Sequence, residues 1–216
     1  MKENVSLTME LEQAIRGRRS IRSYTNQPVP LNLIRKVIEA GTWAPSGKNT
    51  QQWRFTVLTG SSKNDFTKIM RTELDEGSKR FGIAVMGSSF RTCQIMEQAP
   101  AVILVWNAGG AVPGDRVREA VKMIEKRDSR ARELGHKVEI QSVSAAIQNV
   151  LLTAHSLGLG TLWVNDIYYA IDALEKHMKK PWELVAAVTI GWPTEEEKKK
   201  SPPKKKSVDE VSEFCT

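Results

Sequence analysis

Five consecutive residues, Arg18-Arg19-Ser20-Ile21-Arg22, concentrate groups that bind anions. Three guanidiniums and a hydroxyl suit a phosphate, because arginine offers a planar fork of donors and stays charged when partly desolvated. The same run is compatible with an ordinary basic helix end, since cations stabilise the C-terminus of a helix. Taken alone, the run favours the ordinary helix end.

A second run, Pro45-Ser46-Gly47-Lys48-Asn49, begins 27 residues after Arg18. Proline and glycine flank a serine, which predicts a loop whose backbone can approach a ligand closely. The alternative interpretation is a plain connection between a helix and a strand. Taken together, the two runs predict the two halves of a site for an anionic cofactor.

Hydrophobic spacing predicts the elements that position these runs. Ile34, Val37 and Ile38 recur at helical intervals, and residues 101–106 are continuously apolar, as is typical of a buried central strand. The expected helices span residues 8–17, 31–41, 63–73, 115–134, 142–157 and 168–179, and the expected strands 54–59, 101–106, 161–165 and 184–191. This order predicts an α+β fold in which helices flank a small mixed sheet, as one domain over residues 1–216.

The composition limits the class of protein. With 216 residues and 40% hydrophobic side chains, the chain is long enough for a core and too apolar for a disordered protein. No apolar stretch approaches the ~20 residues of a membrane span, and the first residues do not resemble a secretion signal. Cys93 and Cys215 have no metal-like spacing. We therefore expect a cytoplasmic protein without a metal or a membrane contact.

The formal charge of +7 is concentrated near the C-terminus. Six lysines lie within residues 198–206, which leaves +1 on the rest of the chain. A basic run of this kind can bind nucleic acid non-specifically, but it is more often a solvated tail. A nucleic-acid-binding protein without turnover therefore stays an alternative, with this run as its only direct support.

Four motifs, in order, resemble the flavin-dependent nitroreductase family over residues 10–212. The first two are the runs described above, the second continuing through Thr50-Gln51-Gln52-Trp53. The third, residues 145–152 with the Leu-Gly-Leu-Gly-Thr-Leu-Trp of residues 157–163, is similar to the family's central helix and following strand. The fourth is Val-Thr-Ile-Gly-Trp-Pro at residues 188–193, followed by the basic stretch and residues 208–211.

The resemblance implies an intertwined homodimer that binds flavin mononucleotide (FMN) at its interface. Its central helix lies at that interface, and its C-terminal segment reaches across the partner. Arg18 and either Lys204 or Lys205 are then expected at the phosphate. The residues expected at the phosphate and ribityl chain are Arg19 and Ser20. Arg22 is expected at the pyrimidine side of the ring, where a fixed cation stabilises the reduced flavin anion.

The remaining contacts implied by the resemblance come from two other segments. The partner chain contributes its loop, through Pro45, Ser46, Gly47 and Asn49. The end of a strand meets the flavin near N5, mainly through backbone N–H groups, at Trp163, Val164, Asn165 and Asp166. Two departures stand out: Asn165-Asp166 occupies a place where many relatives carry glycine, and Gln52 stands where proline usually precedes Trp53.

The resemblance implies an enzyme that passes hydride from NADH or NADPH through flavin N5 to a small organic acceptor, such as a nitroaromatic, a quinone, an enone or a flavin. One pocket serves both substrates in turn, which predicts ping-pong kinetics, and no protein acid or base is required. Residues 110–140 would be a variable cover over the site. The alternatives are a specialised relative (a dehalogenase or a flavin-fragmenting enzyme) and a non-catalytic flavin-binding protein.

Overall fold

A four-stranded sheet forms the centre of the computed structural model, which describes residues 9–109, 123 and 129–215. Its strands are β1 (Trp53–Thr59), β2 (Ala101–Asn107), β3 (Gly160–Val164) and β4 (Glu183–Gly191), in the order β1-β2-β4-β3. Neighbouring strands pair antiparallel, and an isolated bridge between Ser20 and Thr161 adds parallel pairing. The two central strands are almost entirely buried, as the continuous apolar run of residues 101–106 predicts for β2.

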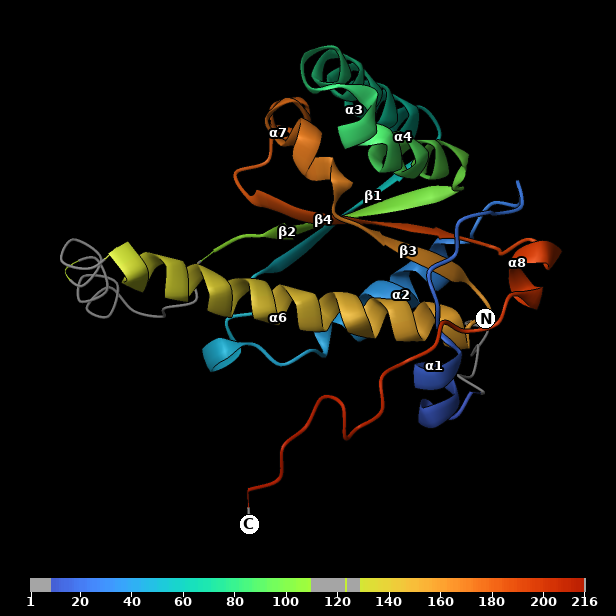
Figure 1. Cartoon of the computed structure of the whole chain (residues 1–216), viewed down its shortest axis with the longest axis vertical. Helices are drawn as coiled ribbons and strands as arrows, with labels where there is room; N and C mark the ends of the chain where they lie inside the picture. Colours follow the sequence, from blue (N-terminus) through green and yellow to red (C-terminus); the bar gives the residue numbers. More distant parts are fainter. Residues whose placement is uncertain (1–8, 110–122, 124–128, 216) are drawn as a thin grey trace.

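Helices cover both faces of this sheet (Figure 1). One face carries α3 (Gly60–Phe81), α4 (Ile83–Gln98) and α7 (Ile171–Met178), and the other carries α2 (Leu31–Thr42) and α6 (Ser129–Ser156). Shorter helices are α1 (Leu11–Gly17), α8 (Glu195–Lys199) and the 3-10 turns η1 (Gly47–Asn49) and η2 (Asp166–Ala170). Because side chains alternate along a strand, β2 sends Leu104 into one apolar cluster and Ile103 into the other.

The four expected strands are confirmed to within one or two residues, whereas several helices differ. Helix α3 extends well beyond 63–73, neither α4 nor α8 was expected, and the expected helix 168–179 is the turn η2 followed by α7. Residues 115–122 and 124–128 of the expected helix 115–134 lie outside the described residues. From Ser129 onward α6 is continuous and runs through Gly135, because an exposed glycine costs a helix only about 1 kcal/mol relative to alanine.

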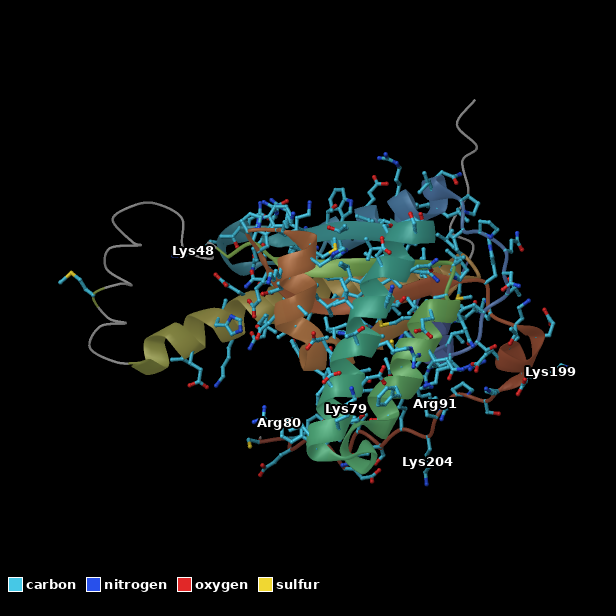
Figure 2. All side chains as sticks on the ribbon, turned by 90° about the horizontal axis from the view of Figure 1, so that it is seen from above. Lys48, Lys79, Arg80, Arg91, Lys199 and Lys204 are labelled. Carbon is cyan, nitrogen blue, oxygen red and sulfur yellow. The ribbon has the colours of Figure 1, made fainter. Side chains whose placement is uncertain are left out.

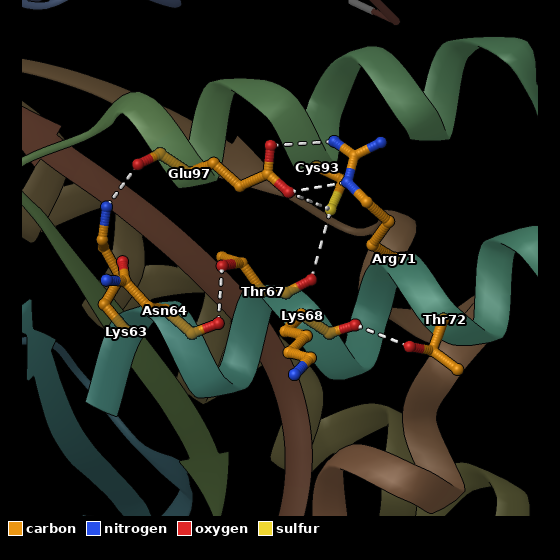
Figure 3. A network of polar contacts seen from close by, with 8 residues as sticks. All are labelled: Lys63, Asn64, Thr67, Lys68, Arg71, Thr72, Cys93 and Glu97. Carbon is orange, nitrogen blue, oxygen red and sulfur yellow. Dashed lines mark hydrogen bonds and ion pairs between the residues drawn. The ribbon is translucent and has the colours of Figure 1, made fainter. Parts of the chain in front are cut away.

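A polar network fastens α4 to α3 (Figure 3). The buried amine of Lys63 donates to the carbonyl oxygens of Glu97 and Ala99, which end α4. Arg71 pairs with both carboxylate oxygens of Glu97, at 2.7 and 2.8 Å. Burial raises the pKa of the neighbouring Cys93 thiol to about 12, so this cysteine is a packing residue and not a nucleophile.

Two kinds of feature are absent from the part of the chain that the structure describes. No helix there is both long and apolar enough to cross a bilayer. No group of three or more histidine, cysteine, aspartate and glutamate side chains is arranged to hold a metal ion there.

Candidate cofactor site

The Arg18–Arg22 run leaves α1 as extended chain and is fastened to the start of β3. Helix α1 ends at Gly17, and Arg18 adopts φ −62° and ψ 135°. The Ile21 N–H donates to the carbonyl oxygen of Thr161 at 2.9 Å. Ile21 is buried against Gly160, where an added Cβ would lie 2.7 Å from the isoleucine side chain. The run is therefore held in place by the sheet rather than left as a free basic helix end.

Three adjoining cavities open around this run, with volumes of about 410, 690 and 550 Å³. We refer to them together as the cationic hollow. Its basic lining residues are Arg16, Arg18, Arg19, Arg22, Arg91, Lys198, Lys200 and Lys205. The acidic residues on its walls are Glu12 and Glu197, and each forms an ion pair with an arginine of the hollow. Such an excess of guanidinium and ammonium groups suits a phosphate-bearing ligand.

Arg19 is already engaged by a protein carboxylate. Its Nη1 donates to Oε2 of Glu197 at 2.9 Å, and both side chains are largely buried. Glu197 belongs to α8 and also accepts from Lys200 Nζ at 2.6 Å. The ion pair joins the N-terminal basic run to the beginning of the C-terminal basic stretch, 178 residues away.

Two residues that the sequence did not single out as ligands also line the hollow. Arg91 comes from α4 and shares a cavity with Ser20 and Arg22. His155 is the penultimate residue of α6 and lies against Gly17, where an added Cβ would be 2.8 Å from His155 Nε2. Burial, followed by the charges of the Arg18 and Arg19 side chains, lowers the pKa of His155 below its usual range. Neither residue carries a local sequence signal, because only the fold brings it to the run.

The second run forms a tight loop near the start of α6. Gly47 faces Val138, which would lie 3.4 Å from an added Cβ. The Ser46 hydroxyl accepts from the backbone N–H of Gln51 at 3.0 Å. Lys48, Asn49 and Gln51 have φ angles of 53°, 55° and 48°. Non-glycine residues seldom adopt this left-handed region, and such strain clusters at functional sites.

The side-chain contacts of Gln52 give a structural reason for glutamine, rather than proline, before Trp53. Its side chain is buried and donates from Nε2 to the Glu139 carbonyl oxygen at 3.2 Å, while Oε1 accepts from the Thr50 hydroxyl at 2.8 Å. The amide thereby ties the loop to α6. Trp53 is a buried core residue.

The two runs do not meet within one protomer. The basic run begins beside His155 of α6, and the loop lies beside Val138 of the same helix. These two positions are 17 residues apart, which corresponds to about 25 Å of helix. Figure 1 shows α1 near one end of α6 and η1 toward the other. Figure 2 likewise places Lys48 at the opposite end of the molecule from Lys199. The residues Pro45, Ser46, Gly47 and Asn49 are therefore separated from the hollow of their own chain.

The end of β3 also lies outside the hollow. Val164 is buried and lies about 10 Å along the strand from Thr161, and the next residue, Asn165, is exposed. Trp163 is half-buried, and its Nε1 is a buried donor without an acceptor among the described residues. Asp166 opens the turn η2. The strand thus leads from the basic run toward the Trp163–Asp166 segment.

The C-terminal stretch is exposed from Lys200 to Cys215. Lys205 shares a cavity with Arg18, whereas Lys204 is exposed and lies outside the hollow. Lys198 is exposed to solvent and also lines the hollow. Further along, Val208, Val211 and Phe214 present large apolar side chains to solvent.

Comparisons with known proteins find similar sequences and similar folds. A flavoprotein from Clostridium difficile 630, described as BluB-like, is 27% identical, with a TM-score of 0.78 over 96% of this chain and all of that one. A Desulfovibrio desulfuricans protein crystallised in complex with FMN is also 27% identical, with a TM-score of 0.67 over 97% of this chain and all of that one. The 5,6-dimethylbenzimidazole synthase of Rhodospirillum rubrum is 24% identical over 86% of this chain and 83% of its own length.

A family model gives the assignment. The model described as the nitroreductase family matches residues 15–192, which include the basic run, the strained loop and all four strands. The chain therefore belongs to the nitroreductase family.

Proposed function

We propose that this protein is an FMN-dependent oxidoreductase that passes hydride from NADH or NADPH to a small organic acceptor, such as a nitroaromatic, a quinone, an enone or a flavin. FMN, when bound, supplies the hydride chemistry at N5. Both substrates would use one pocket in turn, so ping-pong kinetics are expected. A cytoplasmic location and one domain over residues 1–216 remain part of this proposal.

The main observation behind the proposal is that this member of the nitroreductase family has a cationic hollow suited to a phosphate-bearing cofactor. Arg18 and Lys205 share one cavity and would hold the phosphate. Ser20 and Arg22 line another cavity, where Ser20 would meet the ribityl chain and Arg22 would stabilise negative charge on the pyrimidine side of the ring. Lys204 lies outside the hollow, so Lys205 is the preferred lysine of the two.

We also propose a homodimer in which each site draws on both copies. The distance along α6 between the run and the loop supports this arrangement, because a second copy can bring its own Pro45–Asn49 loop to the hollow. The exposed apolar side chains of Val208, Val211 and Phe214 suit a C-terminal segment that packs on the partner. The backbone of Trp163–Asp166 would then meet the flavin near N5.

An absorbance spectrum of the purified protein tests the function. We expect flavin absorption that bleaches when NADH or NADPH is added without oxygen and returns when a quinone is added. A protein that stays colourless after incubation with FMN would refute the proposal. Bound flavin that neither nicotinamide reduces would leave the cofactor in place and remove the nicotinamide step.

A second candidate is a flavin-fragmenting enzyme, which the similarity to the 5,6-dimethylbenzimidazole synthase favours. Asn165-Asp166, where many relatives carry glycine, is the segment in which a specialised chemistry would be expected. Mass spectrometry of the reaction in air separates the candidates. Flavin that is consumed while 5,6-dimethylbenzimidazole appears would favour this second function, and flavin that is recycled intact would favour the first.

A further inference from the structure

A buried carboxylate lies inside the cationic hollow. Glu197 is 3% exposed and is the third residue of the short helix α8. Oε2 accepts from Arg19 Nη1 at 2.9 Å, and Oε1 accepts from Lys200 Nζ at 2.6 Å. Burial opposes its ionisation, but the hydrogen bonds from Lys200 and Arg19 outweigh burial and hold the pKa of Glu197 below its usual range. The carboxylate is therefore charged at neutral pH.

A negative charge at this place does not itself attract a phosphate. At close range it opposes an anionic ligand, so its place in the hollow requires another explanation. The two cations that it binds come from opposite ends of the chain and both line the hollow. Its geometry suits the orientation of these cations rather than direct contact with the ligand.

Helix α8 needs a tertiary contact to hold it in place. It has five residues, which is too short for a helix to be stable alone. Its start is capped by the Thr194 hydroxyl, which accepts from the Glu197 N–H at 3.3 Å. Its end passes at Lys200 into the exposed C-terminal stretch, and that stretch brings Lys205 to Arg18. The contact from Glu197 to Arg19 thus fixes the point from which this stretch departs.

We propose that Glu197 is a positioning residue, which orients Arg19, Lys200 and the departing C-terminal stretch around the phosphate of the bound flavin. The inference rests on the proposed function, because it concerns the phosphate end of the same cofactor site. It assigns to Arg19 a bridging role between Glu197 and the phosphate, since a guanidinium has five donors and Glu197 occupies one of its terminal nitrogens.

Two ligands that differ only in the phosphate test the proposal. Dissociation constants of FMN and of riboflavin would be measured by flavin fluorescence for the full-length protein and for Glu197→Gln. We expect the FMN dissociation constant to rise about tenfold, as for a lost charge-assisted contact, and the riboflavin constant to stay unchanged. A matched control is Glu195→Gln, because Glu195 forms the same type of pair with Lys198, at 2.6 Å, on the exposed side of α8.

Three results would overturn the proposal. Tighter FMN binding by Glu197→Gln would mean that the carboxylate only repels the phosphate. Equal weakening of FMN and riboflavin would mean that Glu197 supports the fold and not the phosphate contact. Equal effects of Glu197→Gln and Glu195→Gln would mean that any lost charge on α8 has this effect. If the wild-type protein bound neither flavin, the proposed function would fall and the inference with it.

A second variant covers the case in which Glu197→Gln does not fold. Lys200→Gln removes the half-exposed partner of Glu197 and keeps the buried pair with Arg19. It is expected to raise the FMN dissociation constant by a smaller factor, again without effect on riboflavin. An unchanged ratio of the two dissociation constants in Lys200→Gln would contradict the positioning role.

Discussion

His155 and Val138 lie 17 residues apart on the single helix α6, and they mark the two halves of the candidate site. His155 contacts the end of α1 at Gly17, directly before the basic run, and Val138 faces Gly47 in the strained loop. About 25 Å of helix separates these contacts. One rigid element therefore fixes both halves and keeps them apart, which supports the proposal that a second copy of the chain supplies the missing half.

Arg18→Ala is expected to weaken FMN binding by about 1.5–3 kcal/mol, because it removes a charged partner of the phosphate. Riboflavin binding should change far less. Fluorescence titration of both ligands measures the effect. Arg80→Ala is the control, since Arg80 lies at the far end of α3, away from the hollow (Figure 2). Unchanged FMN binding in Arg18→Ala would remove Arg18 from the phosphate site.

Gln52→Ala is expected to lower the free energy of unfolding by about 1–3 kcal/mol, because it removes two hydrogen bonds of a buried amide, one to Thr50 in the loop and one to the Glu139 carbonyl oxygen of α6. Urea unfolding of the FMN-free protein measures this change. Gln98→Ala, at the exposed end of α4, should have little effect. A Gln52→Ala protein as stable as the wild type would show that the amide does not hold the loop.

His155 is expected to make folding stability depend on pH. Burial and the charges of Arg18 and Arg19 lower its pKa in the folded protein, so the folded chain takes up this proton only below the ordinary value of about 6.5. The unfolded chain binds the proton first, and stability must therefore decline as the pH falls below about 6.5.

Thermal unfolding of the FMN-free protein between pH 5 and 8 would reveal this dependence. His155→Gln should flatten the acidic part of the stability profile, whereas the exposed His177→Gln should leave its shape unchanged. A profile that is equally steep in His155→Gln would assign the pH dependence to other groups.

The sequence predicted the features that depend on local pattern. A continuous apolar run predicted β2, and the residue types of the basic run and the loop predicted the two halves of the candidate site. The residues that it missed depend on tertiary contacts. Glu197 stands beside Glu195 and Glu196 in one acidic run, and only the fold buries it against Arg19.

Helix α4 was missed for a related reason. Its apolar residues, such as Cys93 and Met96, are preceded by the small residues Gly87, Ser88 and Ser89, and Ser89 is itself buried, so the apolar stripe of this helix is weak in sequence. Its C-terminal end is bound by Lys63 and Arg71 of α3, and its buried side chains join the core. Because α4 was not predicted, there was no reason in the sequence to expect Arg91 in the same cavity as Arg22.

Complementation between two variants that each bind FMN poorly tests most directly whether each site is built from both copies. Arg18→Ala disables the basic run, and Asn49→Gly removes a loop side chain while the backbone keeps its left-handed conformation. The two variants would be unfolded together, refolded as a mixture and titrated with FMN at a concentration that neither binds alone.

If the run and the loop of one site come from different protomers, each mixed dimer contains one intact site. About a quarter of all sites should then recover high-affinity FMN binding, as random pairing of two copies requires. If the run and the loop of one chain form the same site, every site carries one of the two defects. A mixture that binds no more FMN than the separate variants would contradict the shared site.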